Sequence, residues 1–107
     1  MESNSVDLDR ALAAVEARPA VYVLAGADGL YLYKGSCRDL RERLKHHRAG
    51  SVAHTKNRRP LRLVYHEYCD DYTLARQREN WLKSGQGRAW LKQELSARVA
   101  EWHTQRT

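Results

Sequence analysis

Two segments rich in β-branched, leucine and tyrosine residues, AVYVLA (20–25) and LYLYKG (30–35), lie on either side of the short sequence GADG (26–29). Glycine and aspartate favour the tight turn of a β-hairpin, and Asp28 and Gly29 can supply the positive φ angles that such a turn needs. The sequence therefore predicts two antiparallel strands. Because strand side chains alternate between faces, Tyr22 and Tyr33 can point into one shared site. A core of ordinary packing tyrosines is the alternative.

The segments around this hairpin predict helices and one further strand. Apolar residues at helical spacing predict a packing helix over residues 6–17, with Ser5 as its N-cap. A basic helix follows the hairpin, begins near Ser36 or Arg38 and ends at Gly50. The sequence LRLVYHEY (61–68) alternates as a strand does, which places Leu61, Leu63, Tyr65 and Glu67 on one face.

Two helices are predicted in the last third of the chain. LARQRENWLK (74–83) has an apolar face and follows N-terminal helix signals at Asp70, Asp71 and Thr73. The sequence SGQG then interrupts the pattern, and a last amphipathic helix over about 88–102 has an apolar stripe that includes Val99 and Trp102.

This order of elements predicts an α/β (α+β) fold with a small three-stranded antiparallel sheet flanked by helices. A chain of 107 residues fits a single domain, residues 1–107, with its core over about 20–95. At this length roughly two thirds of the unfolded surface can be buried, so we expect no second core.

Basic side chains concentrate in the middle of the chain. The formal net charge is +6, but residues 34–62 contain ten basic and two acidic side chains and so carry +8. This segregation predicts a surface that faces a polyanion, although a solvated basic face without a partner is the alternative. A membrane surface fits less well because the segment has no broad apolar face. The residues that we expect to contact DNA are Lys34, Arg38, Lys45, Lys56, Arg58 and Arg59.

Cys37 and Cys69 are far apart and form no CxxC motif, so free thiols in a reducing cytoplasm are the simplest expectation. Together with the histidines they match no zinc-site spacing. The sequence shows neither a signal peptide nor an apolar run long enough to span a membrane.

Three polar residues fall beside the apolar faces of the predicted helices. At 100° per residue, Arg43 lies about 60° from Leu40, and His47 follows one turn later. Glu79 lies about 40° beyond Ala75 on the next helix. His47 can orient a phosphate or transfer a proton, or it can cover buried apolar surface. Alone, Glu79 would be an ordinary surface acid.

These motifs, in this order, resemble the GIY-YIG nuclease family, especially its small standalone bacterial members and the nuclease domain of the excinuclease C subunit. The resemblance runs from about Ala20 to Leu95. AVY corresponds to the GIY element and YKG to YIG, and the helices GSCRDLRERLKHH and LARQRENWLK are similar to those that carry the family's arginine and glutamate. HTKNRRPLRLVY and KSGQGRAWLK are also similar to sequences in standalone members.

The resemblance implies roles for five positions. Tyr22 and Tyr33 are the motif tyrosines, Gly35 allows a close backbone approach, Arg43 is the catalytic arginine, and Glu79 is the ligand of one Mg²⁺ or Mn²⁺ ion. Three features depart from the pattern: Ala20 replaces a glycine, Lys34 replaces an isoleucine, and no asparagine follows Asn80.

The sequence thus predicts a metal-dependent endonuclease that hydrolyses DNA phosphodiester bonds in repair or recombination. We expect Tyr22, Tyr33, Arg43 and Glu79 to line one concave surface, with either tyrosine as the general base. The alternative is a nucleic-acid-binding module that has kept the fold without turnover. A protein–protein adaptor would leave the basic segment unexplained, and nothing in the sequence indicates an obligate protein partner.

Overall fold

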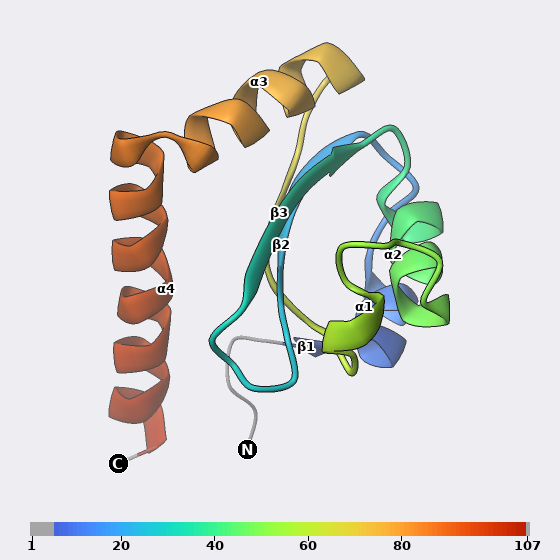
Figure 1. The fold of residues 1–107 in the computed structure, drawn as a ribbon. Helices are drawn as coiled ribbons and strands as arrows, with labels where there is room; N and C mark the ends of the chain where they lie inside the picture. Colours follow the sequence, from blue (N-terminus) through green and yellow to red (C-terminus); the bar gives the residue numbers. More distant parts are fainter. Residues whose placement is uncertain (1–5, 107) are drawn as a thin grey trace.

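A computed structural model describes the backbone of residues 6–106 and the side chains of residues 6–97. The described residues contain one antiparallel sheet of four strands in the order β1-β4-β2-β3 (Figure 1). The strands are β1 (Val6–Asp7), β2 (Ala20–Ala25), β3 (Leu32–Cys37) and β4 (Arg62–Tyr68). The helices are α1 (Leu8–Ala14), α2 (Leu40–Ala49), α3 (Tyr72–Lys83) and α4 (Gly85–Arg106), with a 3₁₀ turn, η1 (Lys56–Arg58).

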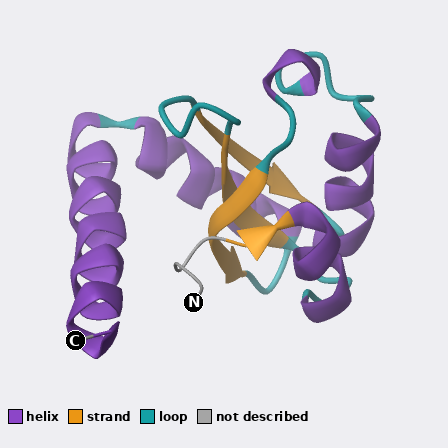
Figure 2. Ribbon diagram, turned by 90° about the horizontal axis from the view of Figure 1, so that it is seen from below, coloured by secondary structure: helices purple, strands orange, loops and turns teal. Residues whose placement is uncertain are grey.

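The helices form two layers on the two faces of the sheet. α1 and α2 pack on one face, whereas α3 and α4 cover the other, and Figures 1 and 2 show the sheet between them. The alternation of β2 makes this possible, because Tyr22 and Leu24 point into the first core and Val21 and Val23 point into the second. The expectation of no second core is therefore wrong, because the sheet divides the buried residues between its two faces. The predicted α+β fold is confirmed, with one strand more than expected.

That extra strand alters the predicted N-terminal helix. Val6 pairs with Leu63 as part of β1, so the helix begins only at Leu8, and Asp7 is its N-cap. A strand of two residues is too short to show a periodic pattern, which is why the predicted helix includes these residues. Ser5, the cap expected from the sequence, lies outside the described residues.

The C-terminal helix begins at Gly85, inside the expected SGQG break. Ser84 explains this start, because its hydroxyl accepts a hydrogen bond from the Gly87 amide at 3.1 Å. Gly87 also has to be a glycine, since a Cβ there would lie 1.8 Å from the carbonyl oxygen of Trp81. The side chains of Val99 and Trp102 lie outside the described part of the chain.

The strict alternation expected for β4 is broken by a bulge. Val23 pairs with Tyr65 while Leu24 pairs with Leu63, which leaves Val64 as an extra residue. Leu63 therefore joins the core under α1 and α2, and Tyr65 joins the core under α3 and α4. The prediction that both share one face is wrong, because a bulge shifts the register by one residue.

The hairpin turn uses only one of its two expected positive φ angles. Gly29 has φ +76°, whereas no non-glycine residue within the described chain has a positive φ. Asp28 contributes through its side chain instead, because its carboxylate accepts hydrogen bonds from the amides of Leu30 and Tyr31. No helix within residues 6–106 is long and apolar enough to cross a membrane.

Asp71 caps α3, the helix that carries Glu79, and its carboxylate accepts a hydrogen bond from the Leu74 amide at 2.9 Å. We expect Asp71→Ala to lower the free energy of unfolding by about 1 kcal/mol, because a helix amide loses its partner. Asp70→Ala is the matched control, since it removes a neighbouring exposed carboxylate outside the cap. Urea denaturation followed by circular dichroism measures both, and equal losses would contradict the assigned cap.

Candidate active site

The hydroxyl group of Tyr22 lies at the centre of a buried hydrogen-bonded cluster. It is 2.8 Å from Nε2 of His47, and Nε of Arg43 donates a hydrogen bond to it at 3.3 Å. Arginine is only a donor, so the phenolic hydrogen is directed to the histidine. Tyr22 is fully buried, and this burial raises the pKa of its phenol far above the ordinary value.

His47 continues the cluster to the loop after α2. Its Nδ1 lies 2.8 Å from the hydroxyl of Thr55, and both side chains are fully buried. Burial lowers the pKa of His47 to about 4, and the neighbouring charge of Arg43 acts in the same direction. The imidazole is therefore neutral at pH 7, accepts from Tyr22 and donates to Thr55. Thr55 was not predicted, since a polar residue in an irregular loop carries no periodic signal.

The local structure of α2 sets the positions of Arg43 and His47. Asp39 caps its start by accepting from the Glu42 amide, and Gly50 ends it in the left-handed conformation with φ +81°. Arg43 and His47 then project from consecutive turns toward the sheet, as their spacing predicts.

Gly35 faces Tyr22 across the β2–β3 pair. A Cβ at Gly35 would lie 2.6 Å from the Tyr22 hydroxyl oxygen and 3.0 Å from the ring of Tyr33. Only a glycine leaves room for both rings, whose centroids are 6.2 Å apart.

Tyr33 lies closer to the surface than Tyr22. It is half-buried, and its ring centroid lies 5.2 Å from that of His47 and 6.1 Å from that of His54. Burial lowers the pKa of Arg43, but hydrogen bonds to Tyr22 and then Tyr33 outweigh it, so the net pKa is raised. Arg43 thus joins both tyrosines and remains charged.

Glu79 belongs to a separate group on the other side of β3. One carboxylate oxygen accepts a hydrogen bond from the Ser36 hydroxyl at 2.5 Å, and the other lies 2.5 Å from Nζ of Lys83. The Glu79 side chain is only 17% exposed, whereas that of Lys83 is 53% exposed. Neither Ser36 nor Lys83 was predicted. The spacing of Glu79 and Lys83, one helical turn apart, is the signal that could have identified their ion pair.

The edge strand β3 separates these two groups. Its residues alternate, so Tyr33 and Gly35 face α2, whereas Lys34 and Ser36 face α3. Arg43 and Glu79 therefore approach β3 from opposite faces of the sheet. The one concave surface expected for Tyr22, Tyr33, Arg43 and Glu79 thus does not lie on a single face of the sheet.

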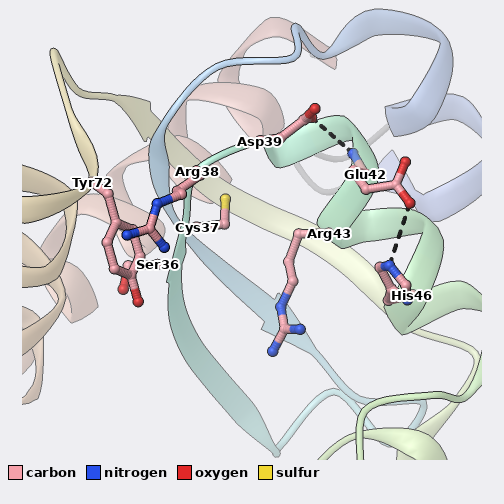
Figure 3. Close-up of a pocket in the computed structure, with 8 residues that line it drawn as sticks. All are labelled: Ser36, Cys37, Arg38, Asp39, Glu42, Arg43, His46 and Tyr72. Atoms are coloured by element: carbon pink, nitrogen blue, oxygen red, sulfur yellow. Dashed lines mark hydrogen bonds and ion pairs between the residues drawn. The ribbon is translucent and has the colours of Figure 1, made fainter.

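A pocket wraps around the end of β3 and brings the two faces together. Figure 3 shows Ser36 and Tyr72 on one side of the strand and Arg43 on the other. Because Ser36 lines this pocket and donates to Glu79, the carboxylate lies one hydrogen bond from the pocket wall. The lining residues are Ser36, Cys37, Arg38, Asp39, Glu42, Arg43, His46 and Tyr72.

A divalent cation at this site would be bound through the carboxylate of Glu79 alone. Among the described side chains, no group of three or more His, Cys, Asp or Glu residues could hold a metal ion, so Glu79 would be a lone carboxylate ligand. Mg²⁺ accepts such a site because it keeps several of its waters. Lys83 already pairs with the outer oxygen of Glu79, and a metal ion on that oxygen would have to displace it. The half-exposed lysine is free to rotate away.

The predicted DNA-contacting residues occupy different environments. The Arg38 guanidinium stacks on Tyr72 at 4.2 Å, beside the pocket, and that of Arg58 stacks on Tyr31 at 4.3 Å. Arg59 instead donates to the carbonyls of Lys56 and Arg48, which ties the loop to the end of α2. Lys45 and Lys56 are exposed, and Lys34 lines a second pocket.

Comparison with known proteins gives one family. Residues 18–93 match the family described as the GIY-YIG catalytic domain. The chain is 39% identical over 70 residues to UPF0213 protein DP2720 of Desulfotalea psychrophila, an alignment that covers 62% of this chain and 63% of that protein. It is 36% identical over 81 residues to a UPF0213 protein of Bacillus pumilus, covering 75% and 76%. The chain thus spans less than two thirds of the Desulfotalea relative. No solved structure matches the chain.

The depressed pKa of His47 makes stability depend on pH. Between pH 6.5 and about 4, the unfolded chain binds a proton at this position and the folded chain does not, so stability falls as pH falls through that window. We expect a loss on the order of 3 kcal/mol in the free energy of unfolding, which His47→Gln should largely remove. His46→Gln, at an exposed neighbour, is the control and should retain the loss. Urea denaturation at a series of pH values tests this, and identical pH profiles for the two variants would refute it.

Proposed function

The chain belongs to the GIY-YIG catalytic-domain family, and from that premise we propose that it is a metal-dependent endonuclease that hydrolyses phosphodiester bonds of DNA, acting in repair or recombination. The observation that carries the proposal is the placement of Arg43, held by both tyrosines, and Glu79 on the two sides of one edge strand. A phosphodiester strand lying along the end of β3 can meet a cation and a carboxylate together.

Arg43 is the residue that we assign to the charge of the transition state. Its guanidinium lines the pocket, and Tyr22 holds it by the hydrogen bond to Nε. The terminal nitrogens of the fork carry further N–H groups that can bind a phosphate, which guanidinium groups bind with well-defined geometry. A preorganised donor of this kind lowers the barrier because it needs no reorganisation during the reaction.

We assign different roles to the two tyrosines. Tyr22 is fully enclosed, and its raised pKa opposes loss of its proton, so we assign it to positioning Arg43 together with His47 and Thr55. Tyr33 is half-buried and lines an open pocket beside Glu79. It is therefore the tyrosine whose hydroxyl can contact an attacking water and take its proton while the phenolic proton passes to a phosphate oxygen.

Glu79 is the residue that would hold the metal ion. A Mg²⁺ or Mn²⁺ ion there would supply positive charge beside the phosphate and the leaving oxygen. Ser36 fixes one carboxylate oxygen by its short hydrogen bond and so presents the other outward. The hydroxyl therefore acts through Glu79, by orienting it.

The second candidate is a nucleic-acid-binding module without turnover. The observation that favours it is the ion pair at Glu79, since Lys83 already neutralises the carboxylate that a metal ion would need. The basic stretch of residues 34–62 serves both candidates equally. The two differ in whether a divalent ion binds and whether DNA is cut.

Cleavage of supercoiled plasmid over a Mn²⁺ titration separates them. We expect Glu79→Gln to lower the nicking rate at least about 100-fold, because the metal ligand is lost. DNA binding should stay equal or become tighter, since a negative charge near phosphate is removed. Glu16→Gln removes an exposed carboxylate that does not line the pocket and should leave the rate unchanged. Equal activity in wild type and Glu79→Gln would contradict the endonuclease proposal, and DNA binding without cleavage in either would support the module.

Lys83→Met tests the competition for Glu79 without any measurement of cleavage. A partly exposed ion pair contributes up to about 1 kcal/mol, so its removal should raise the affinity for Mn²⁺ by about fivefold. The control is Lys92→Met, which removes the same charge at an exposed position further along α4. Free Mn²⁺ measured by electron paramagnetic resonance gives both affinities. Unchanged Mn²⁺ affinity in Lys83→Met would show that the ion does not bind at this carboxylate.

A further inference from the structure

A second pocket lies on the other side of Glu79 from the first. It has a volume of about 350 Å³ and is lined by Leu32, Tyr33, Lys34, His54 and Lys83. Glu79 connects the two pockets, because it bonds to Ser36 in the first and to Lys83 in the second. The second pocket contains two ammonium groups, a phenol and an imidazole, and no carboxylate among its lining residues.

Lys34 is the residue of this pocket that most clearly lacks a partner. Within the described residues, its ammonium group has neither a hydrogen bond nor an ion pair, although the side chain is half-buried on β3. Burial lowers the pKa of this group, and the nearby positive charges of Arg88 and Lys83 lower it further. Three cations converge here without an equal number of anions, so a bound anion would offset both the burial and the repulsion.

The dimensions fit a phosphate of a nucleic-acid strand. Lys34 and Ser36 are two residues apart on the same face of β3, which is about 7 Å at 3.3 Å per residue. Consecutive phosphates of one DNA strand are joined by six backbone bonds and lie about as far apart as these two residues, so the two pockets are about one phosphate apart. A strand bound in the first pocket would therefore bring a neighbouring phosphate to the second.

We propose that Lys34, His54 and Lys83 of this pocket form a phosphate subsite that binds the DNA backbone about one nucleotide from the scissile bond. This inference rests on the proposed endonuclease function for the identity of the strand, but the phosphate chemistry of the pocket stands independently of it. Lys34, which replaces the usual apolar residue of its motif, becomes a contact to substrate.

The test is binding of a labelled DNA duplex in EDTA, followed by fluorescence anisotropy between 50 and 200 mM salt. Lys34→Met should reduce the slope of log affinity against log salt by about 0.9 and weaken binding by up to about tenfold at 0.1 M salt. Lys83→Met tests the second ammonium group in the same way. Lys92→Met changes the net charge equally and should leave the slope near that of wild type. Circular dichroism confirms that each variant is folded.

Duplexes with one neutral methylphosphonate at successive positions locate the contact. At one position the methylphosphonate should weaken binding by wild type. The same duplex should bind Lys34→Met no more weakly than the unmodified duplex does, because this variant has already lost the contact with that phosphate. If wild type binds DNA but Lys34→Met and Lys92→Met behave alike at every position, the subsite is refuted while the endonuclease proposal stands.

If wild type binds no DNA, a titration with pyrophosphate tests the phosphate site, with nuclear magnetic resonance of the lysine side chains as the readout. The absence of DNA binding, if repeated with Ca²⁺ in place of EDTA, would refute the endonuclease proposal. Saturable shifts that disappear in Lys34→Met would then support a pocket for a small phosphate compound, and the absence of such shifts would refute the phosphate site.

Discussion

The hydroxyl group of Tyr22 is the point on which the candidate site depends. A buried hydroxyl without partners costs about 1–3 kcal/mol, so its position requires both a donor and an acceptor nearby. Arg43 and His47 provide them from consecutive turns of α2, and Thr55 satisfies the far nitrogen of the imidazole. Gly35 leaves the space in which this cluster forms. The loop, the helix and β2 are thus joined by one chain of hydrogen bonds that ends at the guanidinium facing the pocket.

The edge position of β3 explains why the site can have two sides. A central strand would bury both of its faces and both of its edges, whereas an edge strand leaves one side of its backbone open. β3 is the last strand of the described sheet, so Arg43 on one face and Glu79 on the other can both contact a ligand that lies along its edge. Ser36 links the two sides, because it lines the same pocket as Arg43 and donates a hydrogen bond to Glu79.

Local signals predicted much of this structure, and non-local pairings account for what they missed. The hairpin, the Gly50 end of α2, and the spacing of Arg43 and His47 follow from residues close together in the sequence. The start of α2 does not, since the sequence predicts a helix from Ser36 or Arg38 but α2 begins at Leu40, after β3 has ended at Cys37. The two-residue strand β1 and the bulge in β4 depend on which strands become neighbours, which no window of the sequence contains. The roles of Ser36 and Thr55 could not be predicted for the same reason, because their partners Glu79 and His47 lie on other elements.

Lys83 connects the two proposals, because it pairs with the carboxylate that would hold a metal ion and also lines the pocket that would hold a phosphate. At equal distance a divalent ion attracts a carboxylate twice as strongly as an ammonium group does, while a half-exposed ion pair contributes only about 1 kcal/mol at most. Charge alone therefore favours the divalent ion over the lysine at this carboxylate. A lysine released from Glu79 remains at the wall of the second pocket, where it adds a second unpaired cation beside Lys34. Occupation of Glu79 by a metal ion and occupation of that pocket by a phosphate would then strengthen each other.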